Sequence, residues 1–217
     1  MALALFDLDN TLLAGDSDYL WGRFLVEQKL VDEDYYDTEN KRFLELYQQG
    51  ELDIYEFAKF AYQPLVDIDA QTLASLHRQF MQDKIRPIIT DKARKLVEKH
   101  KTAGDTLIII TATNSFVTRP IALEFGIENL IATEPEKING HYTGKIAGTP
   151  CFQEGKIRRL QQWLLEQDIA FEDCIFYSDS NNDLPLLKRV MHPVAVDPDE
   201  KLSAYAKTHN WPVMSLR

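Results

Sequence analysis

Two aspartates that directly follow a short apolar segment are the first residues of this sequence that could do chemistry. The segment from Ala2 to Phe6 has the length and bulk of a buried strand, and Asp7 and Asp9 come immediately after it. Carboxylates at the end of a buried strand are costly to desolvate unless a cation or hydrogen-bond donors pair with them. Taken alone, such residues are also common as turn formers and helix caps, so their meaning depends on the rest of the chain.

Two further apolar runs, at 106–111 and 174–179, have the same form, a buried strand that ends in polar residues. A helical pattern follows each run, which indicates an α/β fold with a doubly wound parallel sheet. In such sheets, ligands bind at the carboxyl ends of the strands. We therefore expect the polar clusters DLDNT, TATNS and SDSNND to converge on one crevice.

The stretch between the first two strands is too long and too helical for a simple crossover. Residues 14–90 have apolar residues at helical spacing and no convincing strand. This predicts a helical cap subdomain over 14–90 that controls access to a Rossmann-like catalytic core formed by 1–13 and 91–217. The total length of 217 residues fits one domain with a sizeable insertion. Asn139-Gly140 further predicts a β-hairpin with a type I′ turn.

The composition restricts the partners of the protein. The formal net charge of −10 argues against nucleic acid and anionic membranes as main partners, because both require clustered Lys and Arg. No apolar run approaches the roughly 18 residues of a membrane span, and the first apolar segment lacks the basic region of a signal peptide. We therefore predict a cytoplasmic location. Cys151 and Cys174 fit two reduced structural thiols. Nothing in the sequence marks an oligomer interface.

The acidic residues of the first and last clusters would meet in this crevice. Asp7 and Asp9, joined by Asp179 and Asp183, would gather up to four carboxylates. Like charges at short range raise the pKa of each other or require a cation. Oxygen ligands at this density suit Mg²⁺, which takes a few carboxylates and keeps several waters. The sequence therefore predicts a Mg²⁺ site.

Two other residues suit a phosphoryl group. Thr111 offers a hydroxyl at the end of a strand, and Lys156 offers a positive charge at the start of a helix. A carboxylate nucleophile, a metal ion and two groups that hold phosphate together describe phosphoryl transfer. The predicted partner is therefore a small-molecule phosphate ester.

The polar clusters resemble the motifs of the haloacid dehalogenase-like hydrolases. Four motifs of that family occur here in the family's order: DLDNT at 7–11, Thr111, Lys156, and Asp179 with Asp183. The helical insertion is similar to the small cap of the phosphoserine phosphatase-like branch of the family. The predicted hairpin before the lysine motif is similar to that branch as well.

The resemblance implies catalytic roles for the first motif. Asp7 would attack phosphorus and form an aspartyl-phosphate. Asp9 would protonate the leaving alkoxide and later take a proton from water. A second aspartate at this place favours a phosphatase over a dehalogenase. The Asp7 carboxylate, the Asp9 carbonyl and Asp179 would hold Mg²⁺.

The resemblance also implies roles for the residues around the phosphate and the metal. Thr111 and Lys156, with backbone N–H groups near Asp9 and Ala112, would hold the phosphoryl oxygens. The remaining residues would complete the surroundings of the metal and support its ligands: Asp183, Asn182 and Ser178.

The residue that would select the substrate is Asp16. It lies nine residues after Asp7, where phosphoserine phosphatases carry a Glu that helps to hold the substrate ammonium. An acidic residue there suits an amine-bearing ester, but Asp16 or Ser17 could equally cap the following helix. Phosphoserine phosphatases also use a cap Arg for the substrate carboxylate, and no single residue matches it among four candidates, Arg23, Arg42, Arg78 and Arg86.

The sequence therefore predicts a Mg²⁺-dependent phosphomonoesterase that acts through an aspartyl-phosphate. Its expected substrate is a small amine-bearing phosphate, histidinol phosphate or phosphoserine, with a slight preference for the former. Three alternatives stay open. They are a phosphatase of another small metabolite, a phosphotransferase, and a non-catalytic phosphate-binding protein.

Overall fold

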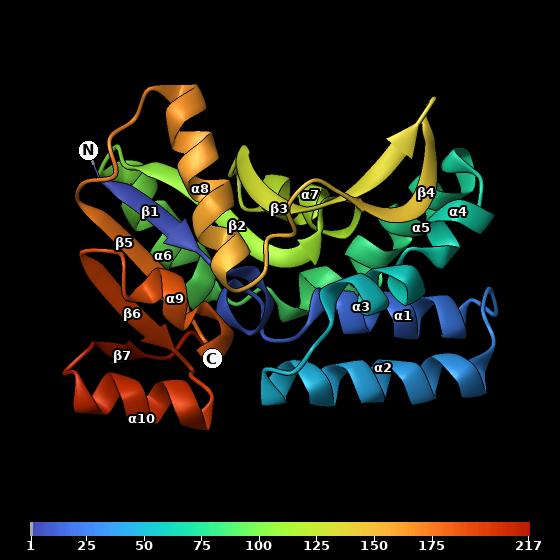
Figure 1. Cartoon of the computed structure of the whole chain (residues 1–217), viewed down its shortest axis with the longest axis horizontal. Coiled ribbons are helices and arrows are strands. Elements are labelled where there is room, and N and C mark those ends of the chain that lie inside the picture. Colours follow the sequence, from blue (N-terminus) through green and yellow to red (C-terminus); the bar gives the residue numbers. More distant parts are fainter. Residues whose placement is uncertain (1) are drawn as a thin grey trace.

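A seven-stranded sheet forms the centre of the computed structural model, which describes residues 2–217. The strands lie in the order β4-β3-β2-β1-β5-β6-β7, and all neighbours are parallel except β3 and β4, which form an antiparallel hairpin (Figure 1). Their bounds are β1 (Leu3–Phe6), β2 (Thr106–Asn114), β3 (Asn129–Ile138), β4 (His141–Ala147), β5 (Cys174–Ser178), β6 (His192–Val196) and β7 (Val213–Met214).

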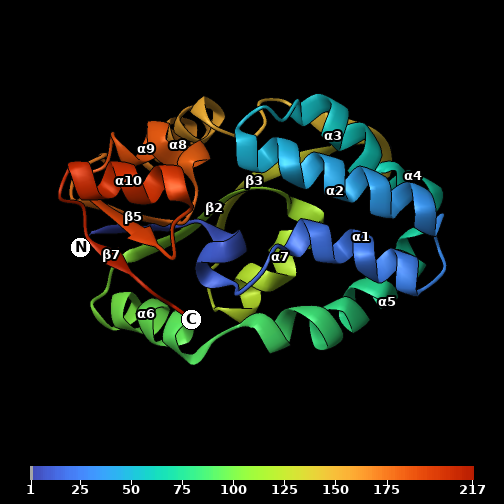
Figure 2. The same cartoon turned by 90° about the horizontal axis from the view of Figure 1, so that it is seen from below.

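Helices cover both faces of the sheet, and the central strand β1 is buried between them (Figure 2). Leu3 and Leu5 pack with residues of α8, α9 and α10, whereas Ala4 and Phe6 pack with residues of α6 and α7. A continuous apolar run is typical of a parallel strand that is covered on both sides. The helix bounds are α6 (Asp91–Thr102), α7 (Ser115–Glu124), α8 (Glu154–Gln167), α9 (Leu184–Leu187) and α10 (Glu200–Thr208), with a short turn η4 (Asn181–Asp183).

The stretch for which a cap was predicted is helical. The chain leaves the core and returns to it at adjacent points, because Leu13 forms a bridge with Ile89 and the Ala14 N–H donates to the Ile88 carbonyl at 2.8 Å. That these helices control access to the core remains a prediction. They are α1 (Ser17–Glu27), α2 (Glu33–Gln49), α3 (Ile54–Ala61), α4 (Gln63–Asp67) and α5 (Ala70–Phe80), followed by the turns η2 (Met81–Ile85) and η3 (Arg86–Ile88).

The cap helices have a small core of their own and rest on the β3–β4 hairpin. Tyr36, Phe43 and Phe60 form this core with Val26, and α3 and α4 contact β4. At the hairpin turn, both Asn139 and Gly140 have positive φ, as the predicted type I′ turn requires. Within the described residues, no helix combines the length and apolar character needed to cross a bilayer.

The predicted fold class, a doubly wound α/β sheet with an inserted helical segment, is confirmed, but one strand is longer than predicted. The second strand was expected to end at Thr111, whereas β2 continues to Asn114, which lies opposite Thr133 of β3. Thr111 and Thr113 therefore lie within a strand, in an irregular stretch between the paired residues Ile110 and Asn114. The strands β6 and β7 were not predicted, because both are short and β6 begins with His192-Pro193.

Candidate active site

Asp7 follows the end of β1 and contacts a buried lysine. Lys156 lies in the first turn of α8 and is only 1% exposed. Its Nζ donates to Asp7 Oδ1 and to Asp183 Oδ2, both at 2.8 Å. Burial acts to lower the pKa of Lys156, but Asp183 and Asp7 raise it well above its usual value, so the ammonium stays charged. Burial raises the pKa of the Asp7 carboxyl to about 7, and Lys156 acts against this shift.

Thr11 connects Asp7 to a second acidic residue, Asp179. The wide turn η1 (Leu8–Leu12) brings Thr11 back to the end of β1, and its middle residue Asn10 has a φ of 56°, which Asn tolerates better than most residues. Thr11 Oγ1 lies 2.9 Å from Asp179 Oδ1 and 3.5 Å from Asp7 Oδ2. Because the hydroxyl has one proton, the stronger bond goes to Asp179.

The chemistry of Asp7 and Asp179 fits a divalent cation. Lys156 contacts Asp7 and Asp183, whereas Asp179 has no ion pair within the described residues. Burial raises the pKa of Asp179 well above its usual value, and the nearby Asp7 raises it further. In the described part of the chain, no three His, Cys, Asp or Glu side chains are arranged as a metal site. The predicted set needs only two carboxylates and the Asp9 carbonyl, because Mg²⁺ completes its ligands with water.

Asp9 is fixed through both of its carboxylate oxygens. Oδ1 accepts a hydrogen bond from the Ser17 N–H at 2.6 Å, and Oδ2 accepts one from Thr113 Oγ1 at 2.8 Å. Burial raises the pKa of Asp9 to about 7, the neighbouring Asp16 adds to this shift, and the two hydrogen bonds act against it. A carboxyl group that titrates near neutral pH can both give and take a proton.

The structure brings Thr111 and Ala112 to the same cavity as Asp7. Both lie on β2, which pairs with β1, and all three residues line the cavity. Thr111 is buried, and its Oγ1 accepts a hydrogen bond from the Thr113 N–H at 3.2 Å. Its hydroxyl proton is therefore available to another acceptor, as a phosphate-binding role requires.

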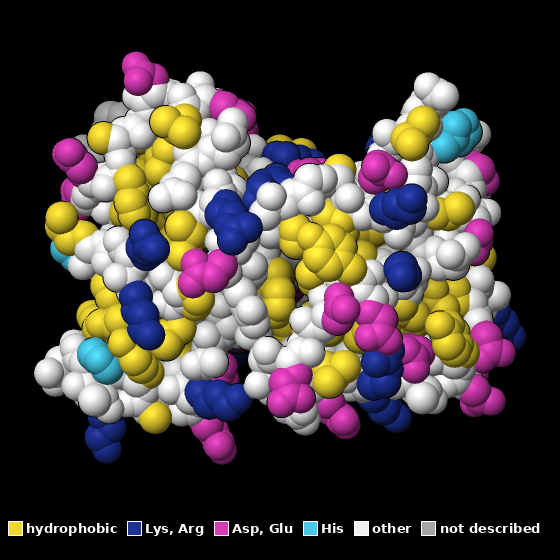
Figure 3. Space-filling view, viewed as in Figure 1, with side chains coloured by type: hydrophobic (Ala, Val, Ile, Leu, Met, Phe, Trp, Pro, Cys, Tyr) yellow, Lys and Arg dark blue, Asp and Glu magenta, His cyan; other side chains and the backbone are white. Residues whose placement is uncertain are grey.

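The two supporting residues of the last motif have different contacts. Ser178 Oγ donates to Asp183 Oδ2 at 2.7 Å and so orients the carboxylate that contacts Lys156. Asn182 instead ties the core to the cap, because its Nδ2 donates to the Tyr47 carbonyl near the end of α2 at 2.9 Å. The space-filling view shows the surface hollowed between α2 and the core on this side (Figure 3).

Asp16 caps α1, as one of the two open interpretations expected. Its Oδ1 accepts hydrogen bonds from the N–H groups of Asp18 at 3.0 Å and Tyr19 at 2.9 Å. Both bonds go to the same oxygen, and no hydrogen bond within the described residues uses Oδ2. Asp16 also lines the cavity beside Asp9. Because capping of α1 uses only Oδ1, the other carboxylate oxygen of Asp16 is available to a ligand.

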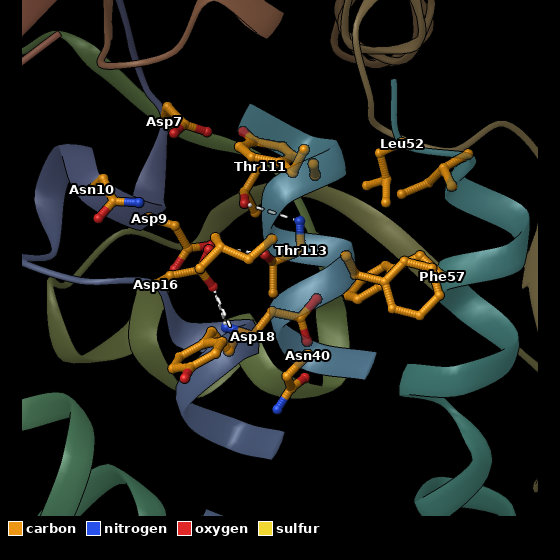
Figure 4. A pocket seen from close by; sticks show the side chains of 16 residues that line it. Asp7, Asp9, Asn10, Asp16, Asp18, Asn40, Leu52, Phe57, Thr111 and Thr113 are labelled. Atoms are coloured by element: carbon orange, nitrogen blue, oxygen red, sulfur yellow. Dashed lines mark hydrogen bonds between the residues drawn. The ribbon is translucent and has the colours of Figure 1, made fainter. Parts of the chain in front are cut away.

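The cavity has an acidic side and an apolar side (Figure 4). Among the described residues, no Lys or Arg lines it. The four arginines considered for a substrate carboxylate lie elsewhere: Arg23 pairs with Asp37, Arg42 with Glu39 and Glu56, Arg86 with Glu124, and Arg78 lines a separate groove. The lining residues are Asp7, Asp9, Asp16, Asp18, Asn10, Asn40, Tyr19, Tyr47, Phe43, Leu44, Leu52, Ile54, Phe57, Thr111, Ala112 and Thr113.

Several residues of the cavity were assigned no role from the sequence, among them Thr113, Asp18 and Asn40. Thr113 holds Asp9, and its place two residues after Thr111 on a strand could have indicated that both side chains face the same way. Asp18 and Asn40 line the cavity from α1 and α2. Asn40 lies three residues before Phe43, on the same face of α2. The helical spacing of apolar residues therefore indicated which face of this helix is buried, but not that this face points into the cavity.

Known proteins of similar sequence show which family the chain belongs to. The family model of the haloacid dehalogenase-like hydrolases matches residues 4–188. A histidinol-phosphatase of Neisseria meningitidis is 45% identical over 219 aligned residues, which cover 99% of both chains. A phosphoserine phosphatase of Mycobacterium tuberculosis is 28% identical over 100% of this chain and 71% of its own length.

Solved structures agree with the sequence comparison. A protein of unknown function from Bordetella pertussis Tohama I superimposes with a TM-score of 0.94 at 45% identity, over 100% of this chain and 99% of that one. A substrate-bound phosphoserine phosphatase shares the fold, with a TM-score of 0.72 at 17% identity over 100% of this chain and 93% of that one. The predicted family is confirmed, and with it the prediction of an enzyme: the chain belongs to the haloacid dehalogenase-like hydrolases.

Proposed function

We propose that the protein is a Mg²⁺-dependent phosphomonoesterase that hydrolyses histidinol phosphate through an aspartyl-phosphate on Asp7. The observation that carries the choice of substrate is the cavity itself. Four carboxylates line it, those of the nucleophile Asp7 and of Asp9, Asp16 and Asp18, and no Lys or Arg of the described residues does. An ester that brings a cationic amine fits this charge, whereas phosphoserine would bring an additional carboxylate that meets no cation.

The relatives support the same assignment. The histidinol-phosphatase of Neisseria meningitidis aligns over nearly the whole of both chains at 45% identity, whereas the phosphoserine phosphatase of Mycobacterium tuberculosis aligns at 28%. The substrate ammonium would lie near Asp16. The Oδ1 atom of this residue caps α1, and its Oδ2 atom would accept from the ammonium.

In the proposed first step, an oxygen of Asp7 attacks phosphorus and the bond from phosphorus to the ester oxygen breaks. Lys156 contacts Asp7 Oδ1 and keeps the nucleophile in position. The Thr111 hydroxyl and the backbone near Ala112 donate to the phosphoryl oxygens, whose charge shifts during transfer. Asp183, itself oriented by Ser178, holds Lys156 from the other side.

Asp9 handles the protons of both steps. It first gives a proton to the leaving alkoxide, which departs as histidinol. It then takes a proton from the water that attacks the phosphorus of the aspartyl-phosphate, so that inorganic phosphate leaves and Asp7 is restored. The hydrogen bonds from Ser17 and Thr113 hold the Asp9 carboxyl in one orientation for both transfers.

Asp7, Asp179 and the Asp9 carbonyl would hold Mg²⁺. The ion supplies positive charge that lowers the repulsion between the carboxylates and the incoming phosphate. Thr11 would support this set, because its hydroxyl contacts Asp179 and lies near Asp7.

The test is steady-state phosphate release by the purified protein with Mg²⁺, on histidinol phosphate, phosphoserine and an aryl phosphate. We expect histidinol phosphate to have the highest kcat/KM, by about 100-fold or more over phosphoserine, because an unpaired buried charge costs a few kcal/mol. Equal or better hydrolysis of phosphoserine would overturn the choice of substrate. Transfer of phosphate to an added alcohol would instead identify a phosphotransferase, and inactivity on all three esters would indicate a binding protein.

A further inference from the structure

Among the polar side chains that line the active-site cavity, Asp18 and Asn40 have no role in the reaction described above. Asp18 lies in the first turn of α1, and Asn40 lies in the middle of α2. Both line the cavity on the side away from Asp7 and Thr111 (Figure 4). Their position suggests that they contact the part of the substrate that is remote from the phosphate.

Asp18 has little to compensate its charge. Its carboxylate accepts one long hydrogen bond, from Asn114 Nδ2 at 3.5 Å, and it has no ion pair within the described residues. Burial raises the pKa of Asp18 well above its usual value, and the nearby Asp16 and Asp9 raise it further. A ligand that donates a hydrogen bond here would replace the missing partner.

Asn40 borders the same space, but its unsatisfied donor, Nδ2, is buried against Gly22 of α1 and points away from the cavity (Figure 4). The residue is 6% exposed, and within the described residues its Nδ2 has no hydrogen-bond partner. It fits between α1 and α2 because Gly22 lies opposite, where a Cβ atom would come within 2.4 Å of Nδ2. Rotation of the amide exchanges its oxygen and nitrogen, so Asn40 can present an N–H to a ligand.

An apolar wall adjoins these two residues. Phe43 of α2 and Phe57 of α3 pack edge to face with ring centroids 5.2 Å apart, and Leu52 and Ile54 complete this side of the cavity. Aromatic rings favour a flat partner that they can contact face to edge or in an offset stack. This side of the cavity therefore suits a planar ring with polar atoms at one edge.

The donor and acceptor pattern distinguishes a ring from an ammonium group. An ammonium only donates, so it would satisfy Asp18 but leave the Asn40 N–H unpaired. A neutral azole ring has one N–H donor and one nitrogen acceptor, which match a carboxylate and an amide N–H respectively. We propose that Asp18 and Asn40 form a subsite that binds the azole ring of the substrate, with Asp18 accepting from the ring N–H and Asn40 donating to the other ring nitrogen.

This inference rests on the proposed function, and three phosphate esters separate the two. Histidinol phosphate carries the ring, phenylalaninol phosphate carries a ring without nitrogen, and alaninol phosphate carries a methyl group instead. All three share the same phosphate and amine. If the unmodified enzyme does not hydrolyse histidinol phosphate, the proposed function fails before the subsite is tested.

The variants Asp18→Asn and Asn40→Leu test the subsite itself. Each should lower kcat/KM for histidinol phosphate by about 10- to 100-fold, the effect of losing one buried hydrogen bond, and for alaninol phosphate by no more than about threefold. The preference of the enzyme for histidinol phosphate over phenylalaninol phosphate should nearly disappear. Asp34→Asn, an exposed change on the same helix as Asn40, is the matched control and should leave all ratios unchanged.

Two results would overturn the subsite. If Asp18→Asn lowers kcat/KM for alaninol phosphate as strongly as for histidinol phosphate, Asp18 holds the ammonium and not the ring. If both variants lower kcat/KM equally for all three esters, the two residues only support the structure of the helical cap subdomain. Melting temperatures and binding of inorganic phosphate, measured on the same variants, show whether a loss comes from misfolding.

Discussion

The two ends of the active-site cavity differ in whether a cationic side chain of the protein pairs with their carboxylates. At the end formed by Asp7, the protein supplies its own cation, because Lys156 contacts both Asp7 and Asp183. At the end formed by Asp16 and Asp18, no Lys or Arg of the described residues is present. The difference indicates that the first end is built around a group that arrives negative, the phosphate. Under the proposed function, the second end binds a group that arrives positive or donates hydrogen bonds.

The largest effect should come from removing the nucleophile. Asp7→Asn keeps the size of the side chain but cannot form a stable acyl phosphate, so we expect hydrolysis of every phosphomonoester to fall by at least about 1000-fold. Phosphate release with Mg²⁺ at equal protein concentration measures this. The melting temperature should not fall, because the change removes a buried charge. Ordinary turnover by this variant would exclude Asp7 as the nucleophile.

Removal of the metal should be nearly as damaging. A chelator should abolish hydrolysis by the unmodified enzyme, and added Mg²⁺ should restore it. Asp179→Asn should raise the Mg²⁺ concentration required for half-maximal activity by about 10-fold or more, since it removes one of two carboxylate ligands. Asp83→Asn, an exposed change in η2 outside the predicted metal set, serves as the control. Full activity in excess chelator would contradict the metal site.

Lys156→Met tests the end where the protein supplies the cation. This change leaves Asp7 and Asp183 buried without a cation, so the free energy of unfolding should fall by about 3–5 kcal/mol. Urea denaturation measures it. Lys95→Met, an exposed change on α6, should stay within about 0.5 kcal/mol of the unmodified protein. Adding Asp183→Asn to Lys156→Met should recover part of the loss, and a further loss instead would show that the carboxylates are not the cause.

Substitution of Asp16, at the other end, should have the smallest effect on activity. Two variants separate its proposed contact with the substrate ammonium from its role as the N-cap of α1. Asp16→Asn keeps the helix cap but removes the charge, so KM should rise by about 10-fold for amine-bearing esters and stay near its original value for an aryl phosphate. Asp16→Ala should show the same KM change and also lose about 1 kcal/mol of stability with the cap. If KM rises equally for the aryl phosphate, Asp16 does not hold the ammonium.

The Lys-paired end could be predicted from the sequence, because each of its residues belongs to a short motif next to an apolar strand. Asp7 follows β1 directly, and Lys156 lies in the first turn of α8, at the start of a helix as predicted. The parallel sheet then determines that these residues meet, since the carboxyl ends of its strands lie together.

The other end could not be predicted in the same way. Asn40 reaches the cavity only because α1 and α2 approach closely at Gly22, a contact that no local pattern encodes. The second strand was predicted to end at Thr111, yet β2 continues to Asn114, which pairs with Thr133 of β3, so that Thr113 lies within the strand. Both residues depend on tertiary contacts between distant segments, which outweigh local propensity.

The most direct test of the contrast between the two ends is binding without turnover. The dissociation constants of histidinol phosphate and phosphoserine can be measured by calorimetry on the Asp7→Asn variant with Mg²⁺. Both ligands present the same phosphate to the Lys156 end, so any difference arises at the other end. We predict that histidinol phosphate binds at least about 100-fold more tightly, because the added carboxylate of phosphoserine would meet only carboxylates there. Equal affinity, or tighter binding of phosphoserine, would contradict the account.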